Sequence, residues 1–150
     1  KSVTPAFLFA ALLWPVFKLH LAGSKNLGLN PQQAFEKSAQ FAINEQLGYT
    51  AIPRRFTLAT KEIWELQNKL GIRSKRNIEK VFNHMRFRAA YDFLLLREAS
   101  GEELNGLGQW WTKFQESNEE EREQLLFSRN KNRRRYSKKR KSSYHNDTGL

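Results

Sequence analysis

One stretch near the middle of the chain decides the fold class: His84-Met85-Arg86-Phe87-Arg88-Ala89-Ala90-Tyr91-Asp92-Phe93-Leu94-Leu95. Its apolar side chains recur at the three- and four-residue spacing of an α-helix, at positions 87, 90, 91, 94 and 95. Phe93 and Leu96 widen this face until little of the helix is left for water. We therefore expect a helix from about residue 86 to 99 in the middle of a bundle. Arg88 should pair with Asp92 one turn further on.

The rest of the first 127 residues repeats this helical spacing, with signals for helix starts and ends. Thr4-Pro5 and Asn30-Pro31 each combine a capping side chain with a proline at the first helical position, and Gly48 ends the second helix. No segment shows the alternating pattern of a β-strand. The predicted fold is all-α, an irregular bundle of about six to seven helices. Further helices are expected over about 54–70, 75–82, 109–115 and 119–127.

The N-terminal segment from Ala6 to Trp14 is apolar on every side until Pro15 interrupts it. Because proline lacks a backbone donor, we expect Pro15 to kink the helix or to start a second one. We interpret the segment as a buried helix that ends at Gly23. A secretory signal is the alternative, although Lys18 interrupts the segment and no clear cleavage site follows. A membrane span needs about 20 apolar residues, and this run is shorter.

Basic residues outnumber acidic ones, and most of the excess lies at the C-terminal end. The chain has 26 Lys and Arg against 15 Asp and Glu, a net charge of +11 and a pI near 10.1. Nine of the basic residues lie between Arg129 and Lys141, so residues 1–128 carry only +3. The excess indicates a polyanionic partner. Because apolar residues nearly vanish after residue 127, we expect a folded body over 1–127 and a disordered basic tail over 128–150.

The residue types that catalysis and metal binding require are sparse. Asp92 and Asp147 are the only aspartates and lie far apart, whereas two-metal chemistry needs grouped carboxylates. The three histidines show no ligand spacing, and the chain has no cysteine. Gly23-Ser24-Lys25 lacks the preceding strand and the glycine spacing of a phosphate-binding loop. We expect no catalytic, metal-binding or cofactor-binding residue in this chain.

The positive charge of the helices favours a binding function. Arg54 and Arg55 start a helix, where unpaired backbone N–H groups also favour phosphate. If the cations converge on one side, they form a track for an RNA backbone. A solvated face with intramolecular ion pairs is the alternative. The predicted RNA-binding residues are Arg54, Arg55, Arg73, Lys75, Arg76, Lys80, Arg86 and Arg88 in the body, and Arg133, Arg134, Arg135, Lys138, Lys139, Arg140 and Lys141 in the tail.

Two adjacent tryptophans near the end of the body have two interpretations. Phe114 lies one turn from Trp110 on the same helix face, while Trp111 points about 100° away. Burial of both tryptophans in the bundle is the default. Stacking of a base on the exposed one is the alternative, and we name Trp111 as that residue.

Several motifs, in order, resemble one known family, the bacterial poly(A) polymerases. The similarity to the C-terminal half of that family rests on Ala51-Ile52-Pro53-Arg54-Arg55-Phe56-Thr57, Ile63-Trp64-Glu65-Leu66-Gln67, Phe87-Arg88-Ala89-Ala90-Tyr91-Asp92 and Trp110-Trp111-x-x-Phe114-Gln115. The opening segment 5–11 and the arginine-rich tail are similar too. The tail favours this branch over the related CCA-adding enzymes. The resemblance implies a polynucleotide adenylyltransferase, a nucleotidyltransferase that adds AMP from ATP to RNA 3′ ends with Mg²⁺ in an N-terminal head.

The motifs of that catalytic head have no counterpart in this sequence, and the chain begins with Lys1. We therefore expect a piece of a longer cytoplasmic protein of mRNA processing, whose ATP and Mg²⁺ sites lie elsewhere. The resemblance implies that this piece holds and guides RNA 3′ ends during polyadenylation, and we expect no DNA specificity. Contact of the tail with RNA-decay proteins is a separate hypothesis, which belongs to the protein-interaction alternative below. Two alternatives stay open. One is a membrane-surface module that associates weakly with anionic lipid, and the other is a protein-interaction module.

Overall fold

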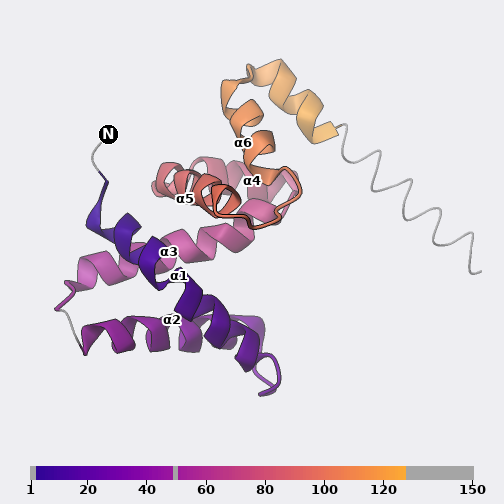
Figure 1. Ribbon diagram of the computed structural model, residues 1–150. Helices are drawn as coiled ribbons and strands as arrows, with labels where there is room; N and C mark the ends of the chain where they lie inside the picture. The colour runs from indigo at the N-terminus through magenta and orange to yellow at the C-terminus, as the bar shows by residue number, and fades with distance from the viewer. Residues whose placement is uncertain (1–2, 49–50, 128–150) are drawn as a thin grey trace, which may run out of the picture. The chain divides into compact units, whose positions relative to one another are not determined.

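The computed structural model describes residues 3–48 and 51–127, and all regular structure in these ranges is helical (Figure 1). This confirms the predicted all-α class. The helices are α1 (Pro5–Ser24), α2 (Pro31–Leu47), α3 (Arg54–Gly71), α4 (Lys75–Phe82), α5 (Phe87–Ala99) and α6 (Leu107–Glu116), followed by a helical segment over 119–127. The chain divides into two compact units between Asn105 and Gly106. The expected tail, residues 128–150, lies outside the described residues.

The first helix, α1, begins as predicted and continues past the residue expected to interrupt it. The Thr4 hydroxyl accepts a 3.3 Å hydrogen bond from the backbone N–H of Phe7, and Pro5 occupies the first turn. Pro15 lies inside the helix, which ends only at Ser24, so of the two expected outcomes, a kink or a second helix start, the second did not occur. Pro15 is exposed to solvent, where water can bond to the carbonyl oxygen that proline leaves without a donor.

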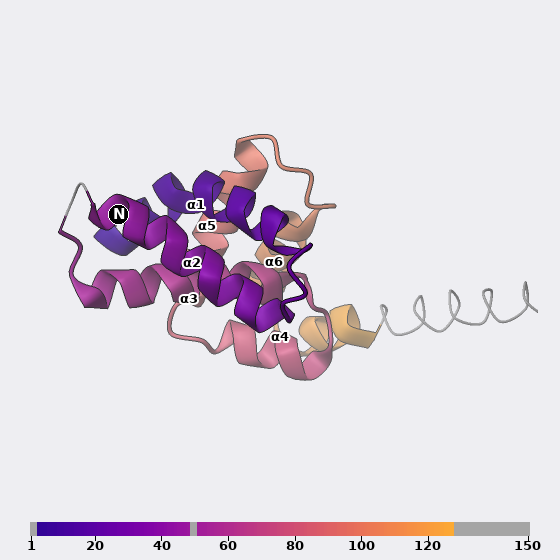
Figure 2. The same ribbon diagram turned by 90° about the horizontal axis from the view of Figure 1, so that it is seen from below.

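The core of the first unit forms where α1 packs on α2 and α3, and Figures 1 and 2 show these three helices alongside one another. The Phe17 ring of α1 stacks on Trp64 of α3 with a centroid separation of 4.6 Å. Trp64 Nε1 donates a 3.0 Å hydrogen bond to the carbonyl oxygen of Ala10. Because Ala10 carries only a methyl group and is fully buried, the indole can reach the backbone of α1.

The helix expected at the centre, α5, instead lies at one side of the first unit. It packs chiefly on α3 and, to a smaller extent, on α1. Four of its predicted core residues, at positions 87, 90, 91 and 94, are buried, as is Phe93. Leu95 and Leu96 remain 36% and 44% exposed, so the prediction that little of this helix meets water was wrong. The buried core cluster comes mostly from α1, α2 and α3, and α5 contributes Phe93 to it.

One side of α1 is apolar and exposed, which corrects the expectation of a helix buried all round. Leu12 and Leu19 are 71% and 78% exposed, and Leu8 and Val16 continue the same side one turn apart. We call these four residues the α1 stripe. Because α1 runs through Pro15, its length and composition would let it cross a membrane, contrary to the sequence-based expectation. Core helices of soluble proteins meet the same criterion, and the opposite side of α1 lies in the core.

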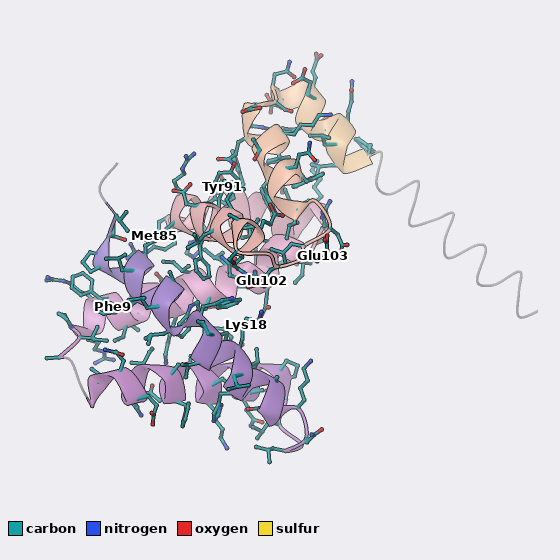
Figure 3. The ribbon with its side chains drawn as sticks, in the orientation of Figure 1. Phe9, Lys18, Met85, Tyr91, Glu102 and Glu103 are labelled. Carbon is teal, nitrogen blue, oxygen red and sulfur yellow. The ribbon has the colours of Figure 1, made fainter. Side chains whose placement is uncertain are left out.

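A carboxylate in the loop after α5 connects that loop to α1. Glu102 Oε1 accepts a 2.9 Å hydrogen bond from Trp14 Nε1, and Oε2 accepts a 2.8 Å bond from Arg97 Nη2. Lys18 Nζ lies 3.3 Å from the same Oε2 (Figure 3). Burial alone would raise the pKa of Glu102, but the hydrogen bonds from Arg97 and Trp14, the charge of Arg97 and the hydrogen bond from Lys18 outweigh it and lower the pKa from 4.5 to about 2.

The second unit is described over residues 106–127 and consists of α6 and the helical segment over 119–127. Gly106 precedes α6 with a φ of 71°, a left-handed conformation that glycine adopts without strain. Arg122 joins the two helical segments because its Nε donates a 2.9 Å hydrogen bond to the carbonyl oxygen of Phe114. Its Nη2 donates a second bond of 3.0 Å to the carbonyl oxygen of Gln115. The carbonyls at the end of α6 are thereby satisfied by a side chain.

Candidate nucleic-acid interface

The first pair of predicted RNA-binding residues lies at the N-terminal end of α3. Arg54 and Arg55 are the first two residues of the helix, and both are exposed. Pro53 occupies the cap position, and no side chain among the described residues caps the helix, so these residues leave its first N–H groups available to an anion. The Arg55 guanidinium lies 4.8 Å from the Phe56 ring. This end of α3 therefore offers two guanidinium groups beside the positive end of the helix dipole.

A second group of cations surrounds α4, which the sequence placed correctly. Ser74 caps the helix by accepting a 3.3 Å hydrogen bond from the backbone N–H of Asn77. Lys75 Nζ lies 3.9 Å from Glu79 Oε1. Arg76 and Lys80, both exposed, have no side-chain partner within the ranges that the structure describes. Arg73, at the end of the loop before Ser74, is half-buried.

The two arginines at the start of α5 are partly neutralised by carboxylates. Arg86 Nε lies 3.1 Å from Glu62 Oε2 of α3, and Arg88 Nε lies 3.3 Å from Asp92 Oδ1. The second of these is the predicted pair one turn apart. His84 Nδ1 accepts a 3.0 Å hydrogen bond from the backbone N–H of Arg86, which shapes the turn that leads into α5. Both ion pairs are exposed enough to be weak.

The structure spreads these cations along α3 and does not gather them in one cluster. Arg54 and Arg55 stand at the start of α3, while Arg73 to Lys80 follow its end, about 27 Å away by helix rise. Arg86 lies between the two groups, because its partner Glu62 is near the middle of α3. A polynucleotide that contacted all three groups would therefore run along α3. Their role in RNA binding stays a prediction.

The structure distinguishes the two adjacent tryptophans. Trp111 has no exposed surface, whereas Trp110 is partly exposed and stacks on Phe114 with a centroid separation of 5.2 Å. The two indoles meet edge to face at 5.0 Å. A base has no surface to stack on at Trp111, so naming Trp111 as the stacking residue was wrong. Because the two side chains lie about 100° apart around α6, Trp111 is on the buried side of the helix while Trp110 keeps accessible surface.

A pocket of about 450 Å³ opens in the first unit, at the start of α1 and α5, and sequence reasoning missed it. Its apolar lining comes from Val3, Ala6, Phe7, Ile63, Met85 and Ala89, and its polar lining from Thr4, Arg86, Arg88 and Asp92. Figure 3 shows Met85 in this region, and its side chain is 81% exposed. No local sequence motif predicts the pocket, because its walls come from three separate parts of the sequence. The sequence offered at most one signal, the chain's single methionine, Met85, between His84 and Arg86.

The described residues do not fit the magnesium site that the resemblance implies for a longer protein. Over 3–48 and 51–127, no three His, Asp or Glu side chains gather closely enough to hold a metal ion. Several of their carboxylates pair with lysine or arginine, as Glu65 does with Lys69 at 2.7 Å. The predicted tail residues, from Arg133 to Lys141, lie outside the described residues.

The described residues form an all-α protein with cationic helix ends, and known proteins are similar to it in sequence. Residues 27–145 match the family model described as the polymerase A arginine-rich C-terminus. Over 118 residues the chain is 38% identical to poly(A) polymerase I of Salmonella typhi and to that of Escherichia coli O157:H7. Over 120 residues it is 35% identical to poly(A) polymerase I of Haemophilus influenzae.

The chain therefore belongs to the family of arginine-rich C-terminal regions of bacterial poly(A) polymerases, as the sequence motifs indicated. The matches cover 77% of this chain for the first two relatives and 79% for the third. They cover 25% or 26% of the relatives. The chain thus spans about a quarter of the length of the curated relatives it matches.

Proposed function

We propose that this chain is the RNA-holding part of a bacterial poly(A) polymerase. The longer protein would add AMP from ATP to RNA 3′ ends in the cytoplasm, with Mg²⁺ and catalytic residues supplied by sequence outside this chain. Family membership is the observation that carries the proposal. It is supported by the three cationic groups along α3, of which Arg76 and Lys80 are unpaired among the described residues.

The cationic groups suit RNA because phosphate binding by lysine and arginine releases counterions and does not depend on base sequence. An enzyme that extends many different RNA ends needs this kind of contact. The distance between the first and last groups, about 27 Å along α3, lets one single strand contact both. The tail, with most of the excess charge, would raise the encounter rate and the affinity without adding specificity.

The proposal is tested by measuring the affinity of the chain for oligo(A) at several salt concentrations, for example by fluorescence anisotropy. If about six phosphates are neutralised, log K should fall with log salt with a slope near −4, from about −0.7 per contact to a single strand. An affinity that does not change with salt would contradict phosphate binding. Absence of binding at low salt would refute the proposed function itself.

Charge reversal identifies the residues that take part. The double variant Arg76→Glu and Lys80→Glu should weaken oligo(A) binding by about tenfold or more and flatten the salt slope by about one to two units. The matched control is Lys25→Glu and Lys37→Glu, which changes the net charge equally at two exposed residues, one in the turn after α1 and one in α2. Equal losses for both double variants would mean that only net charge matters. No loss at Arg76 and Lys80 would remove them from the interface.

A second candidate function is favoured by the α1 stripe. An exposed apolar helix side together with a basic tail is the combination that lets a protein lie on an anionic membrane. Co-sedimentation with phosphatidylserine vesicles, with and without competing oligo(A), separates this candidate from RNA binding. The membrane candidate predicts that Leu12→Glu abolishes vesicle binding and leaves oligo(A) binding unchanged. Contacts with RNA-decay proteins stay a proposal, tested by pull-down in the presence of ribonuclease.

A further inference from the structure

We propose that the pocket at the start of α1 and α5 holds one base of the bound RNA, a base that carries an exocyclic amino group. This inference rests on the proposed RNA-holding function and assigns a specific place to part of the ligand. The three cationic groups along α3 can bind phosphates without any cavity, so the pocket is a separate feature of the site.

The shape and lining of the pocket suit a planar aromatic ligand. Its volume of about 450 Å³ lies within the roughly 300–1,000 Å³ that is typical of small-molecule sites. Phe7, Ile63 and Ala89 give it apolar walls, and the Phe7 ring is held edge-on against Phe93 at 6.1 Å. Single-stranded RNA is recognised by bases that leave the stack and lie against aromatic or apolar side chains. The flexible, exposed Met85 side chain is suited to close over such a base.

Two guanidinium groups line the same pocket and can bind the phosphate of the nucleotide whose base enters it. Arg86 and Arg88 both line the pocket. The pair between Arg88 and Asp92 is exposed on both sides, at 59% and 36%, so solvent screens it and a phosphate can replace the carboxylate at little cost. Arginine also binds phosphate through two parallel hydrogen bonds, which a nearby carboxylate does not prevent.

Asp92 gives the site a chemical preference among bases. Its side chain is bonded to Arg88 through Oδ1, and no other partner is found among the described residues, so Oδ2 is free to accept a hydrogen bond. An ionised carboxylate is an acceptor only. It therefore favours the amino group of adenine, cytosine or guanine, and it disfavours uracil, which carries only carbonyl oxygens outside its ring. The pocket should prefer oligo(A) to oligo(U).

The test separates base binding from phosphate binding. Ala89→Phe fills the pocket without changing any charge, and Ala99→Phe places the same substitution at an exposed residue of α5 that does not line it. Affinities are measured for oligo(A), for oligo(U) and for an abasic oligonucleotide of the same length. Ala89→Phe should weaken oligo(A) binding by about tenfold, as expected for the loss of one stacked base, and leave abasic binding unchanged. Ala99→Phe should change neither.

A second variant keeps the test decisive if Ala89→Phe disturbs folding. Met85 is so exposed that Met85→Ser cannot empty the core, yet it should still weaken oligo(A) binding selectively. Equal weakening for oligo(A) and the abasic strand, or no weakening in either variant, would overturn the pocket assignment. Equal affinity of the wild-type chain for oligo(A) and oligo(U) would overturn the role of Asp92. If the wild-type chain bound none of the three, the proposed function itself would fail.

Discussion

Gln67 Nε2 donates a 3.0 Å hydrogen bond to the carbonyl oxygen of Ala90, and this bond joins α3 to α5 inside the core. The Gln67 side chain is only 4% exposed, and both its amide nitrogen and its amide oxygen are hydrogen-bonded. The same Nε2 donates to the carbonyl oxygen of Ile63 at 3.2 Å, and Oε1 accepts from Arg97 Nη1 at 3.2 Å. A single buried amide thus holds the two helices that flank the pocket at a fixed separation.

Replacing this amide should destabilise the first unit. Gln67→Met preserves the approximate volume but leaves Arg97 Nη1 without its acceptor in a half-buried position, and should lower the free energy of unfolding by about 1–3 kcal/mol. Urea denaturation followed by circular dichroism measures the change. Gln32→Met, at an exposed residue of α2, is the control and should stay within about 0.5 kcal/mol of the wild type. Comparable losses in both variants would show that the buried amide has no special role.

Glu102 should make stability depend on pH in the acidic range. Because folding lowers its pKa from 4.5 to about 2, the unfolded chain takes up the proton first. The stability that Glu102 contributes is fully present above about pH 4.5 and is lost as the pH falls towards 2. In Glu102→Gln this part of the acid dependence should disappear. Urea denaturation curves at several pH values between these limits test it, and parallel pH profiles for the two proteins would contradict the assignment.

Removing the cap of α2 should cost a moderate amount of stability. Asn30 Oδ1 accepts a 2.8 Å hydrogen bond from the backbone N–H of Gln33, whose own side chain accepts from the Asn30 N–H at 3.2 Å. Asn30→Ala removes the capping side chain of this reciprocal pair and should lower the midpoint of thermal unfolding, at a cost of about 1 kcal/mol. Asn26→Ala, in the preceding turn, should leave the midpoint nearly unchanged. A larger effect at Asn26 would show that the loop, not the cap, stabilises this region.

Two neighbouring leucines of α1 should respond very differently to truncation. Leu13 is 7% exposed and lies in the core, whereas Leu12 belongs to the α1 stripe and is 71% exposed. Leu13→Ala should lower the free energy of unfolding by about 2–5 kcal/mol, because it leaves a cavity. Leu12→Ala should change it by less than about 0.5 kcal/mol. A large loss at Leu12 would mean that the α1 stripe is covered in the folded protein in solution.

Deleting residues 129–150 should weaken RNA binding and reduce its salt dependence together. The deletion removes nine of the 26 basic residues, and the slope should flatten by about 0.7 for every phosphate that the shortened chain no longer neutralises. Oligo(A) titrations of the full and shortened chains at several salt concentrations provide the comparison. An unchanged slope would show that the tail neutralises no phosphates.

The helices themselves followed from local sequence, because caps and spacing act over a few residues. The starts of α1 and α2 at Thr4 and Asn30 were predicted from capping side chains, and both form the expected hydrogen bonds. What failed were statements about which side of a helix is covered. The exposure of Leu95, of the α1 stripe and of Trp110 depends on where other helices lie, and a one-dimensional pattern does not contain that information.

The candidate site, too, was predictable from the sequence only where its contacts are local. Basic residues were identifiable from the sequence, but their ion pairs were only partly so. The pair between Arg88 and Asp92 lies within one helix and was predicted, whereas the bond from Arg86 to Glu62 crosses between helices and was not. The pocket depends on residues as far apart as Val3 and Asp92, so only the folded chain reveals it.

The bond from Trp14 to Glu102 spans 88 residues of sequence, and this separation bears on the order in which the protein folds. A helix bond closes only a four-residue loop, whereas this contact must close a loop of 88 residues, so the local helices should form before this contact does. During synthesis, α1 leaves the ribosome well before the loop that carries its last hydrogen-bonding partner. Until that loop arrives, the indole of Trp14 lacks its native acceptor, and completion of the first unit has to wait for residue 102.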